Sequence, residues 1–216
     1  MIRPLLAAVV FAALLLAGCG DSAPNGVAAA NKAAGNRSAP AATPDVARVR
    51  IETEAGPIVL ELDGRRAPLT TANFLAYVDQ HRFDGTSFYR AARTPGAQGR
   101  GFIQGGIRRN YRLMLAPVAH EPTSTTGLSH RDGTISMART DPGSAMGNFF
   151  ITVGAMPQMD AHGRDQGFAA FGRVVEGMDV VRRILAAPTV ANAGSGAMRG
   201  QMIAAPVRIV GARREQ

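Results

Sequence analysis

The chain has 216 residues, of which 46% are hydrophobic, and it carries 24 Lys and Arg against 16 Asp and Glu, a formal net charge of +8. With a single cysteine it has no disulfide of its own, which excludes a disulfide-stapled scaffold. Its arginines are scattered and are not interleaved with aromatic residues, which argues against nucleic acid as a partner.

The N-terminus has the pattern of an export signal. Arg3 precedes an apolar run from Leu5 to Leu16, and small residues follow that run. A basic start, a short apolar stretch and small residues before the cleavage point are typical of a secretory signal. The run is shorter than the ~20 apolar residues that cross a bilayer. We therefore predict a signal peptide over residues 1–18.

The end of this signal resembles a bacterial lipobox. It reads Leu16-Ala17-Gly18-Cys19, and in a lipobox the cysteine becomes the lipidated first residue of the mature protein. We expect lipidation at Cys19 and a location in the bacterial cell envelope, lipid-anchored and facing the periplasm. Gly20, rather than Asp, follows the cysteine, which slightly favours the outer membrane. An ordinary cleaved signal with a chance cysteine is the alternative.

A low-complexity segment follows. Residues 20–44 consist mainly of Ala, Gly, Pro, Asn and Ser and cannot bury enough apolar surface to offset the entropy of ordering. We predict that residues 19–44 form a lipidated flexible linker. The remaining residues, 45–216, suit one domain, which we expect to be monomeric.

Short strands dominate this predicted domain. From alternating apolar residues we expect strands at 46–53, 58–62, 87–91, 102–104, 134–138, 149–153, 168–174 and 207–210. Helices are predicted over 68–80, opened by Pro68, and over 178–187, stopped by Pro188. The set fits a mainly β fold, a closed eight-stranded antiparallel barrel capped by two α-helices. The pattern alone also fits an open α+β sheet.

Four short segments carry the most specific signal: Ser87-Phe88-Tyr89-Arg90, Phe102-Ile103-Gln104-Gly105-Gly106, Ser136-Met137-Ala138-Arg139 and Asn148-Phe149-Phe150-Ile151. They resemble the active-site strands of the cyclophilin-type peptidyl-prolyl cis-trans isomerases. Residues 67–78 resemble the first helix of the same family and residues 171–181 the entry to its second helix, and the likeness covers about residues 46–211. The resemblance implies the cyclophilin barrel and isomerase activity without a cofactor.

The residue types suit that chemistry. An X-Pro amide resists rotation with a barrier of about 20 kcal/mol, and twisting it gives the proline nitrogen a lone pair. A donor aimed at that lone pair binds the twisted state better than either planar state. Arg90 offers five donors and a permanent charge. By the resemblance, Arg90 and Gln104 are the catalytic residues, with Gln104 contacting the substrate carbonyl region and holding the arginine.

The resemblance also implies a substrate-binding set. Phe150 forms the floor of the proline pocket, while Phe149 should point into the barrel core. Gly101 stands where the family has Phe, so either Phe102 swings in to line the pocket or the pocket is wider. The predicted substrate-binding residues are Tyr89, Phe102, Met137, Ala138, Arg139, Asn148, Phe150, Met159 and Phe168.

Other chemistries find little support in the sequence. The histidines show no metal-ligand spacing and no second cysteine exists, so we expect no metal and no cofactor. Ser129 and His130 are adjacent, which in a strand would put them on opposite faces.

The predicted function is therefore isomerisation of prolines in unfolded or loop segments of envelope proteins. The alternative is a proline-peptide-binding or chaperone module with little turnover, which the enlarged loop 93–100 favours. A basic barrel that carries a small ligand is a third reading.

Overall fold

The computed structural model describes residues 43–108 and 110–215. The strands are β1 (Val46–Thr53), β2 (Gly56–Asp63), β3 (Ser87–Arg93), β4 (Gly101–Gly106), β5 (Thr134–Met137), β6 (Asn148–Val153), β7 (Ala170–Glu176), β8 (Thr189–Val190) and β9 (Met202–Glu215). The helices are α1 (Pro68–Asp79), α2 (Thr123–Thr126) and α3 (Met178–Ala186), with 3₁₀ turns η1 (Tyr111–Leu113), η2 (Pro157–Met159) and η3 (Gly196–Met198).

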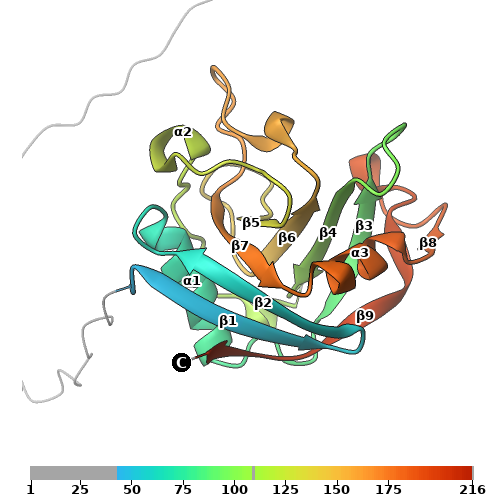
Figure 1. Ribbon diagram of the computed structural model, residues 1–216, viewed down its shortest axis with the longest axis horizontal. Coiled ribbons are helices and arrows are strands. Elements are labelled where there is room, and N and C mark those ends of the chain that lie inside the picture. The colour runs from blue at the N-terminus through green and yellow to red at the C-terminus, as the bar shows by residue number, and fades with distance from the viewer. Residues whose placement is uncertain (1–42, 109, 216) are drawn as a thin grey trace, which may run out of the picture. The chain divides into compact units, whose positions relative to one another are not determined.

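The strands close into an antiparallel barrel (Figure 1). The order is β1-β2-β7-β5-β6-β4-β3-β9, and β9 pairs back onto β1 so that Arg48 lies opposite Glu215. Closure satisfies the backbone groups that an open sheet would leave at its edges. The predicted eight-stranded barrel is confirmed. The two-residue β8 is an addition, paired with β9.

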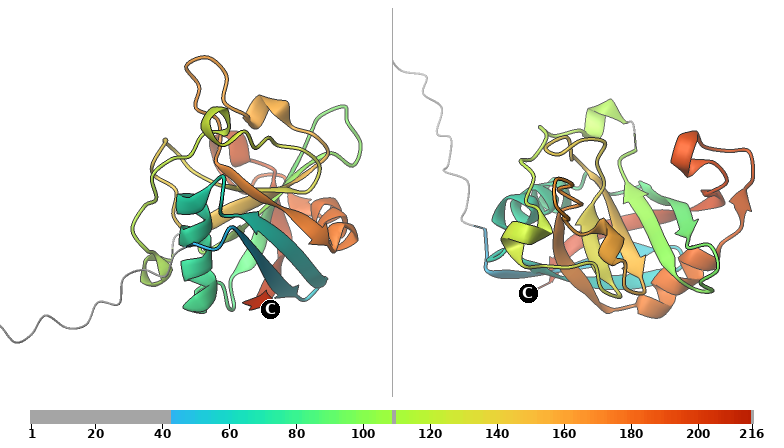
Figure 2. Two further views of the ribbon diagram at one scale, coloured as in Figure 1. Left: turned by 60° about the vertical axis from the view of Figure 1, so that its left-hand side comes forward. Right: turned by 90° about the horizontal axis from the view of Figure 1, so that it is seen from above.

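Alternation along the strands builds the core. In β1, Val49 and Ile51 are fully buried and alternate with more exposed residues. Phe149 of β6 points inward as predicted, and its ring lies edge-on to Phe74 of α1 at 5.4 Å. The helices α1 and α3 cover the two ends of the barrel with their apolar sides (Figure 2).

Three further features differ from the prediction. The short α2 is an additional helix, and β7 begins at Ala170 rather than Phe168. The last strand begins at Met202 rather than Val207. The run Ala204-Ala205-Pro206 has no apolar alternation that would predict a strand. The first part of β9 is held instead by residues distant in sequence, such as Pro188, whose carbonyl accepts a hydrogen bond from the N–H of Ala204.

The predicted signal peptide and almost all of the predicted linker lie outside the described residues. Within residues 43–108 and 110–215, no helix is both long and apolar enough to cross a bilayer.

A buried polar chain ties three segments together behind β5. The Nδ1–H of His130 donates to Asp160 Oδ1 at 2.6 Å, and its Nε2 accepts from Ser136 Oγ at 2.9 Å. The backbone N–H of His130 also donates to Asp160. Burial lowers the pKa of His130, and the hydrogen bond to Asp160 opposes that shift. The imidazole is therefore held neutral in the folded protein.

We predict that the free energy of unfolding falls as the pH is lowered from about 8 to about 5. In the unfolded chain the pKa of His130 returns to its ordinary value of 6.5. Below that pH the unfolded state binds a proton that the folded state rejects. The stabilisation is complete above that value and is lost as the pH falls toward the lower folded-state pKa.

Urea midpoints measured across this range test the idea. The His130→Gln variant should show a shallower slope between pH 8 and 5 than the parent chain. Identical slopes in the two proteins would contradict it.

Candidate active site

One cleft gathers the predicted site residues. It encloses about 880 Å³ on the face formed by β3, β4 and β6. All of the predicted catalytic and substrate-binding residues except Met137 line it: Tyr89, Arg90, Phe102, Gln104, Ala138, Arg139, Asn148, Phe150, Met159 and Phe168. Residues that are distant in sequence meet here because neighbouring strands present the same face.

The structure corrects the prediction for Met137. Its side chain is 1% exposed and packs in the barrel core with Ile135, on the opposite face of β5 from Ser136. The motif around it does reach the cleft, through the next residues Ala138 and Arg139. Strand alternation therefore separates Met137 from its neighbours in the same motif.

A bulge in β3 places two consecutive side chains in the cleft. Phe88 pairs with Gly105 and Arg90 pairs with Gln104, so Tyr89 and Arg90 together oppose a single residue of β4. Such a bulge breaks the strict alternation of faces. Phe88 remains in the core, while Tyr89 and Arg90 both line the cleft.

The guanidinium of Arg90 is held from two sides. Its Nη1 donates to Gln104 Oε1 at 2.8 Å, and its Nε donates to Gln201 Oε1 at 2.8 Å. Its central carbon lies 4.9 Å from the centre of the Phe102 ring. Burial lowers the pKa of Arg90. The side chain nevertheless stays charged, because arginine does not lose its proton in proteins.

The amide of Gln104 is oriented in turn. Its Nε2 donates to the Tyr89 hydroxyl at 2.8 Å, and that hydroxyl donates to Asn148 Oδ1 at 3.3 Å. This chain points Gln104 Oε1 at the guanidinium. Burial raises the pKa of Tyr89, so the hydroxyl keeps its proton at neutral pH. Asn148 also accepts from the backbone N–H of Arg108 at 2.7 Å, which fixes the end of the chain.

Three phenylalanines form an aromatic wall of the cleft. Phe150 lies at its base, 5.3 Å from Phe102 and 5.3 Å from Phe168, the latter edge-on at 87°. The ring of His130 stacks on Phe150 at 5.7 Å and 11°. The buried polar chain behind β5 therefore supports the ring at the base of the cleft.

Of the two possibilities that the sequence leaves open at Gly101, a wider pocket or a Phe102 that lines it, the structure has the second. A Cβ at Gly101, where φ is +145°, would lie 2.1 Å from the carbonyl oxygen of Ala92, so a side chain does not fit there. Phe102 instead turns its ring into the cleft. The aromatic wall is thus kept by a neighbouring residue.

Several residues in or beside the cleft were not identified from the sequence. Gln201 lies beside the cleft, where it accepts a hydrogen bond from Arg90, and comes from the segment between β8 and β9. Met198, from the same segment, lines the cleft itself. Arg108 lies 4.9 Å from the Tyr89 ring centre at the cleft edge. No sequence signal marks Gln201 and Met198, because their position follows from the pairing of β9 with β3. Arg108 follows β4, and its backbone N–H donates to Asn148.

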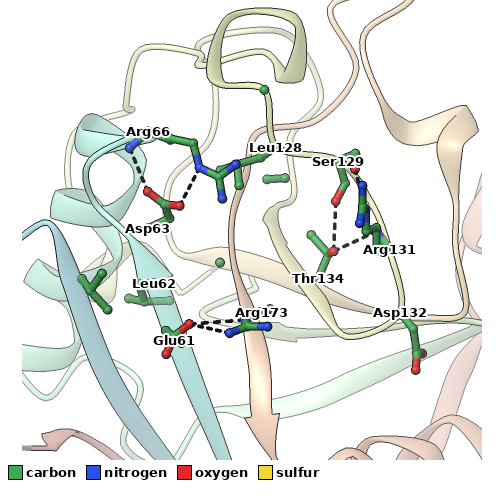
Figure 3. Close-up of a pocket in the computed structure, with 14 residues that line it drawn as sticks. Glu61, Leu62, Asp63, Arg66, Leu128, Ser129, Arg131, Asp132, Thr134 and Arg173 are labelled. Carbon is green, nitrogen blue, oxygen red and sulfur yellow. Dashed lines mark hydrogen bonds and ion pairs between the residues drawn. The ribbon is translucent and has the colours of Figure 1, made fainter.

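A second hollow of about 470 Å³ lies between β2, β7 and the loop before β5 (Figure 3). Four of its charged residues form two ion pairs. Arg66 meets Asp63 at 2.6 Å and Arg173 meets Glu61 at 2.8 Å (Figure 3). The hollow shares no lining residue with the cleft among those described.

The Ser136, His130 and Asp160 side chains follow the order of a hydrolase triad. Ser136 and His130 are 0% and 1% exposed, and the ring of Phe150 stacks on His130. A nucleophile must be reached by its substrate. This buried hydroxyl is therefore structural.

The cleft has the chemistry of a binding site for an apolar ring beside a polar backbone. It offers the fixed guanidinium of Arg90, side-chain amides and aromatic walls. In the described part of the chain, no group of three or more His, Cys, Asp or Glu is arranged to hold a metal ion.

Several known proteins with similar sequences are isomerases of one type. A protein from Streptomyces antibioticus described as a peptidyl-prolyl cis-trans isomerase is 40% identical over 150 residues, 68% of this chain and 87% of that protein. One from Acinetobacter baylyi is 37% identical over 142 residues, 65% of this chain and 73% of its own. The isomerase B of Escherichia coli is 34% identical over 140 residues, 63% of this chain and 82% of its own.

Solved structures share the barrel. The crystal structure of a cyclophilin-type isomerase from Cryptosporidium parvum matches with a TM-score of 0.63 at 21% identity, over 79% of this chain and 98% of that one. At 21% identity this likeness shows a shared fold.

The sequence model of the family described as "Cyclophilin type peptidyl-prolyl cis-trans isomerase/CLD" matches residues 48–213. That stretch contains the whole cleft and nearly all of the barrel. By sequence and by fold, this chain belongs to the cyclophilin-type peptidyl-prolyl cis-trans isomerases.

Proposed function

We propose that Arg90 and Gln104 drive the isomerisation by binding the twisted state of an X-Pro amide in this cleft. The observation that carries the proposal is the placement of the Arg90 guanidinium, fixed by two glutamine oxygens against the aromatic wall. Within the described chain, Nε and Nη1 already have acceptors, and Nη2 is free to donate into the cleft.

The substrate proline packs on Phe150, with Phe102 and Phe168 at its sides. Rotation about the amide removes resonance and leaves a lone pair on the proline nitrogen, which accepts a hydrogen bond from Arg90. The planar cis and trans states lack that lone pair, so the bond forms only near the transition state. One donor of this kind contributes about 3–4 kcal/mol, a factor of roughly 10²–10³ in rate.

Neutral partners keep the cation effective. Gln104 and Gln201 accept hydrogen bonds from Arg90 without bringing a negative charge. A carboxylate at either place would offset the field at the prolyl nitrogen. The lowered pKa of Arg90 reflects the same environment, because burial acts on it without a facing carboxylate.

The protein acts at the bacterial cell envelope, on prolines in unfolded or loop segments of envelope proteins. The support is the sequence before the barrel, where Cys19, the only cysteine of the chain, ends a lipobox-like Leu-Ala-Gly-Cys. Several acyl chains, at about 0.8 kcal/mol for each buried methylene, anchor a protein stably to a membrane.

The charges of the cleft favour acidic residues near the substrate proline. Its lining includes Arg90, Arg108 and Arg139, and no Asp or Glu among the described residues. Arg139 lies over the Phe168 ring at 4.9 Å, and Arg108 lies over the Tyr89 ring at the same distance. Arg139 is held inside the protein, because its Nε donates to the Gly167 carbonyl and its Nη2 lies 3.9 Å from Asp165. The exposed Arg108 is therefore the flanking arginine placed to meet the residues beside the proline.

We predict that Arg90→Ala lowers kcat/KM for an Ala-Pro peptide roughly 10²- to 10³-fold, because the donor to the twisted state is lost. Arg90→Lys should recover only part of it, since an ammonium lacks the planar fork. Exchange NMR on the peptide, with catalytic amounts of each purified variant, measures both rates. A protein that binds the peptide but leaves its isomerisation at the uncatalysed rate would instead support the binding-module alternative.

We predict that peptides with Glu beside the proline have a kcat/KM about two- to fivefold higher than matched peptides with Lys. Exposed ion pairs contribute about 0.2–1 kcal/mol each, and salt screens them. Raising the salt concentration should shrink the ratio, and Arg108→Gln should reduce it. The exposed Arg48→Gln, on β1, is the control for net charge. A ratio of one at low salt would refute the preference.

We predict that Cys19→Ala moves the full-length protein from the membrane fraction to the soluble periplasmic fraction. The variant has no sulfur to acylate, so the anchor is lost. Cell fractionation and labelling with a fatty-acid analogue read out the two properties. Unlabelled wild-type protein in the soluble fraction would show that the signal is an ordinary cleaved one.

A further inference from the structure

The segment between β8 and β9 forms one side of the cleft. It leaves the two-residue β8, turns through η3 and returns to the barrel at Gln201 and Met202 (Figure 1). Met198 and Met202 line the cleft on the side of Arg90. The segment is thus part of the active site rather than a remote loop.

An irregularity in the β3–β9 pairing places this segment. Phe88 lies opposite Val207, whereas Arg90, two residues on, lies opposite Met202. Five positions of β9 therefore lie opposite two positions of β3. Within this stretch β9 pairs with β8 instead, and Ile203 lies opposite Thr189. The result brings Gln201 beside Arg90, and the N–H of Ala91 donates to the Gln201 carbonyl at 2.9 Å.

The side chain of Gln201 completes a clamp on the cation. Its Oε1 accepts from Nε of Arg90 at 2.8 Å, while Gln104 accepts from Nη1 at the same distance. A planar group held at one nitrogen can still turn about that contact. Held at two nitrogens, its plane and the direction of its remaining donors are fixed.

We propose that Gln201 is a positioning residue for the isomerisation, acting through Arg90. This inference rests on the proposed role of Arg90. Gln201 fixes the orientation of the guanidinium, which the single hydrogen bond to Gln104 leaves free to rotate. Because the donor must meet a lone pair that exists only in the twisted amide, a small rotation of the plane lowers catalysis without preventing peptide binding.

The two contacts of Gln201 can be separated. The hydrogen bond to Ala91 uses the main-chain carbonyl, so it survives any change of side chain. The contact with Arg90 uses only the side-chain oxygen. Gln201→Met keeps the length and much of the volume of the side chain and removes the acceptor, so it tests the clamp with the strand pairing intact.

In Gln201→Met we expect kcat to fall about ten- to a hundredfold, with KM changed less than twofold, which is the pattern for an interaction realised in the transition state. The Arg90 Nε–H resonance should also exchange faster with water. Arg199→Ala is the matched control. Arg199 lies on the same segment, contacts Asn192 and does not line the cleft, so its loss should leave kcat unchanged.

A double-mutant cycle identifies the route of the effect. If Gln201 acts through Arg90, adding Gln201→Met to Arg90→Ala should lower kcat no further. An equal drop in both backgrounds, or a wild-type kcat and Nε–H signal in Gln201→Met, would overturn the proposal. Failure of the proposed role of Arg90 would look different, because Arg90→Ala itself would then retain wild-type activity.

Discussion

The site depends on keeping one half-buried cation, Arg90, charged, fixed and unneutralised. Taking a guanidinium out of water is costly unless its donors are satisfied. Here glutamine oxygens satisfy two of them, and the Phe102 ring meets the face of the group. Neutral acceptors meet the hydrogen-bond requirement without cancelling the charge. That choice separates this site from a salt bridge, where a carboxylate would stabilise Arg90 and weaken its pull on a lone pair.

The closed barrel makes this arrangement rigid. Each cleft strand has core residues on its other face: Ile103 backs Phe102 and Gln104 on β4, and Phe149 backs Phe150 on β6. A shift of a cleft side chain would therefore disturb close-packed core contacts. The β3 bulge is the local departure from alternation that the cation needs, because it turns Arg90 to the same side as Tyr89.

Local patterns predicted most of the fold and most of the cleft. The eight barrel strands follow from apolar alternation, and the cleft residues follow from the resemblance of short motifs to a known family. Met137 was assigned to the cleft because the motif was taken whole, whereas alternation puts its side chain in the core. Gln201 escaped prediction for a different reason. It is separated from Arg90 by 111 positions, and its place depends on a register shift that no local pattern reveals.

The polar half of the site, Arg90, and its aromatic half, Phe150, are held in place by different kinds of contact. Gln201 and Gln104 hold the cation, and the neutral imidazole of His130 backs the Phe150 ring. The pKa of Arg90 is lowered and that of Tyr89 raised by burial, yet both groups keep their protons at neutral pH. The pKa of His130 is lowered by the same cause. Lowering the pH therefore first protonates His130 and weakens the packing behind the Phe150 ring, while the charge of Arg90 is unchanged.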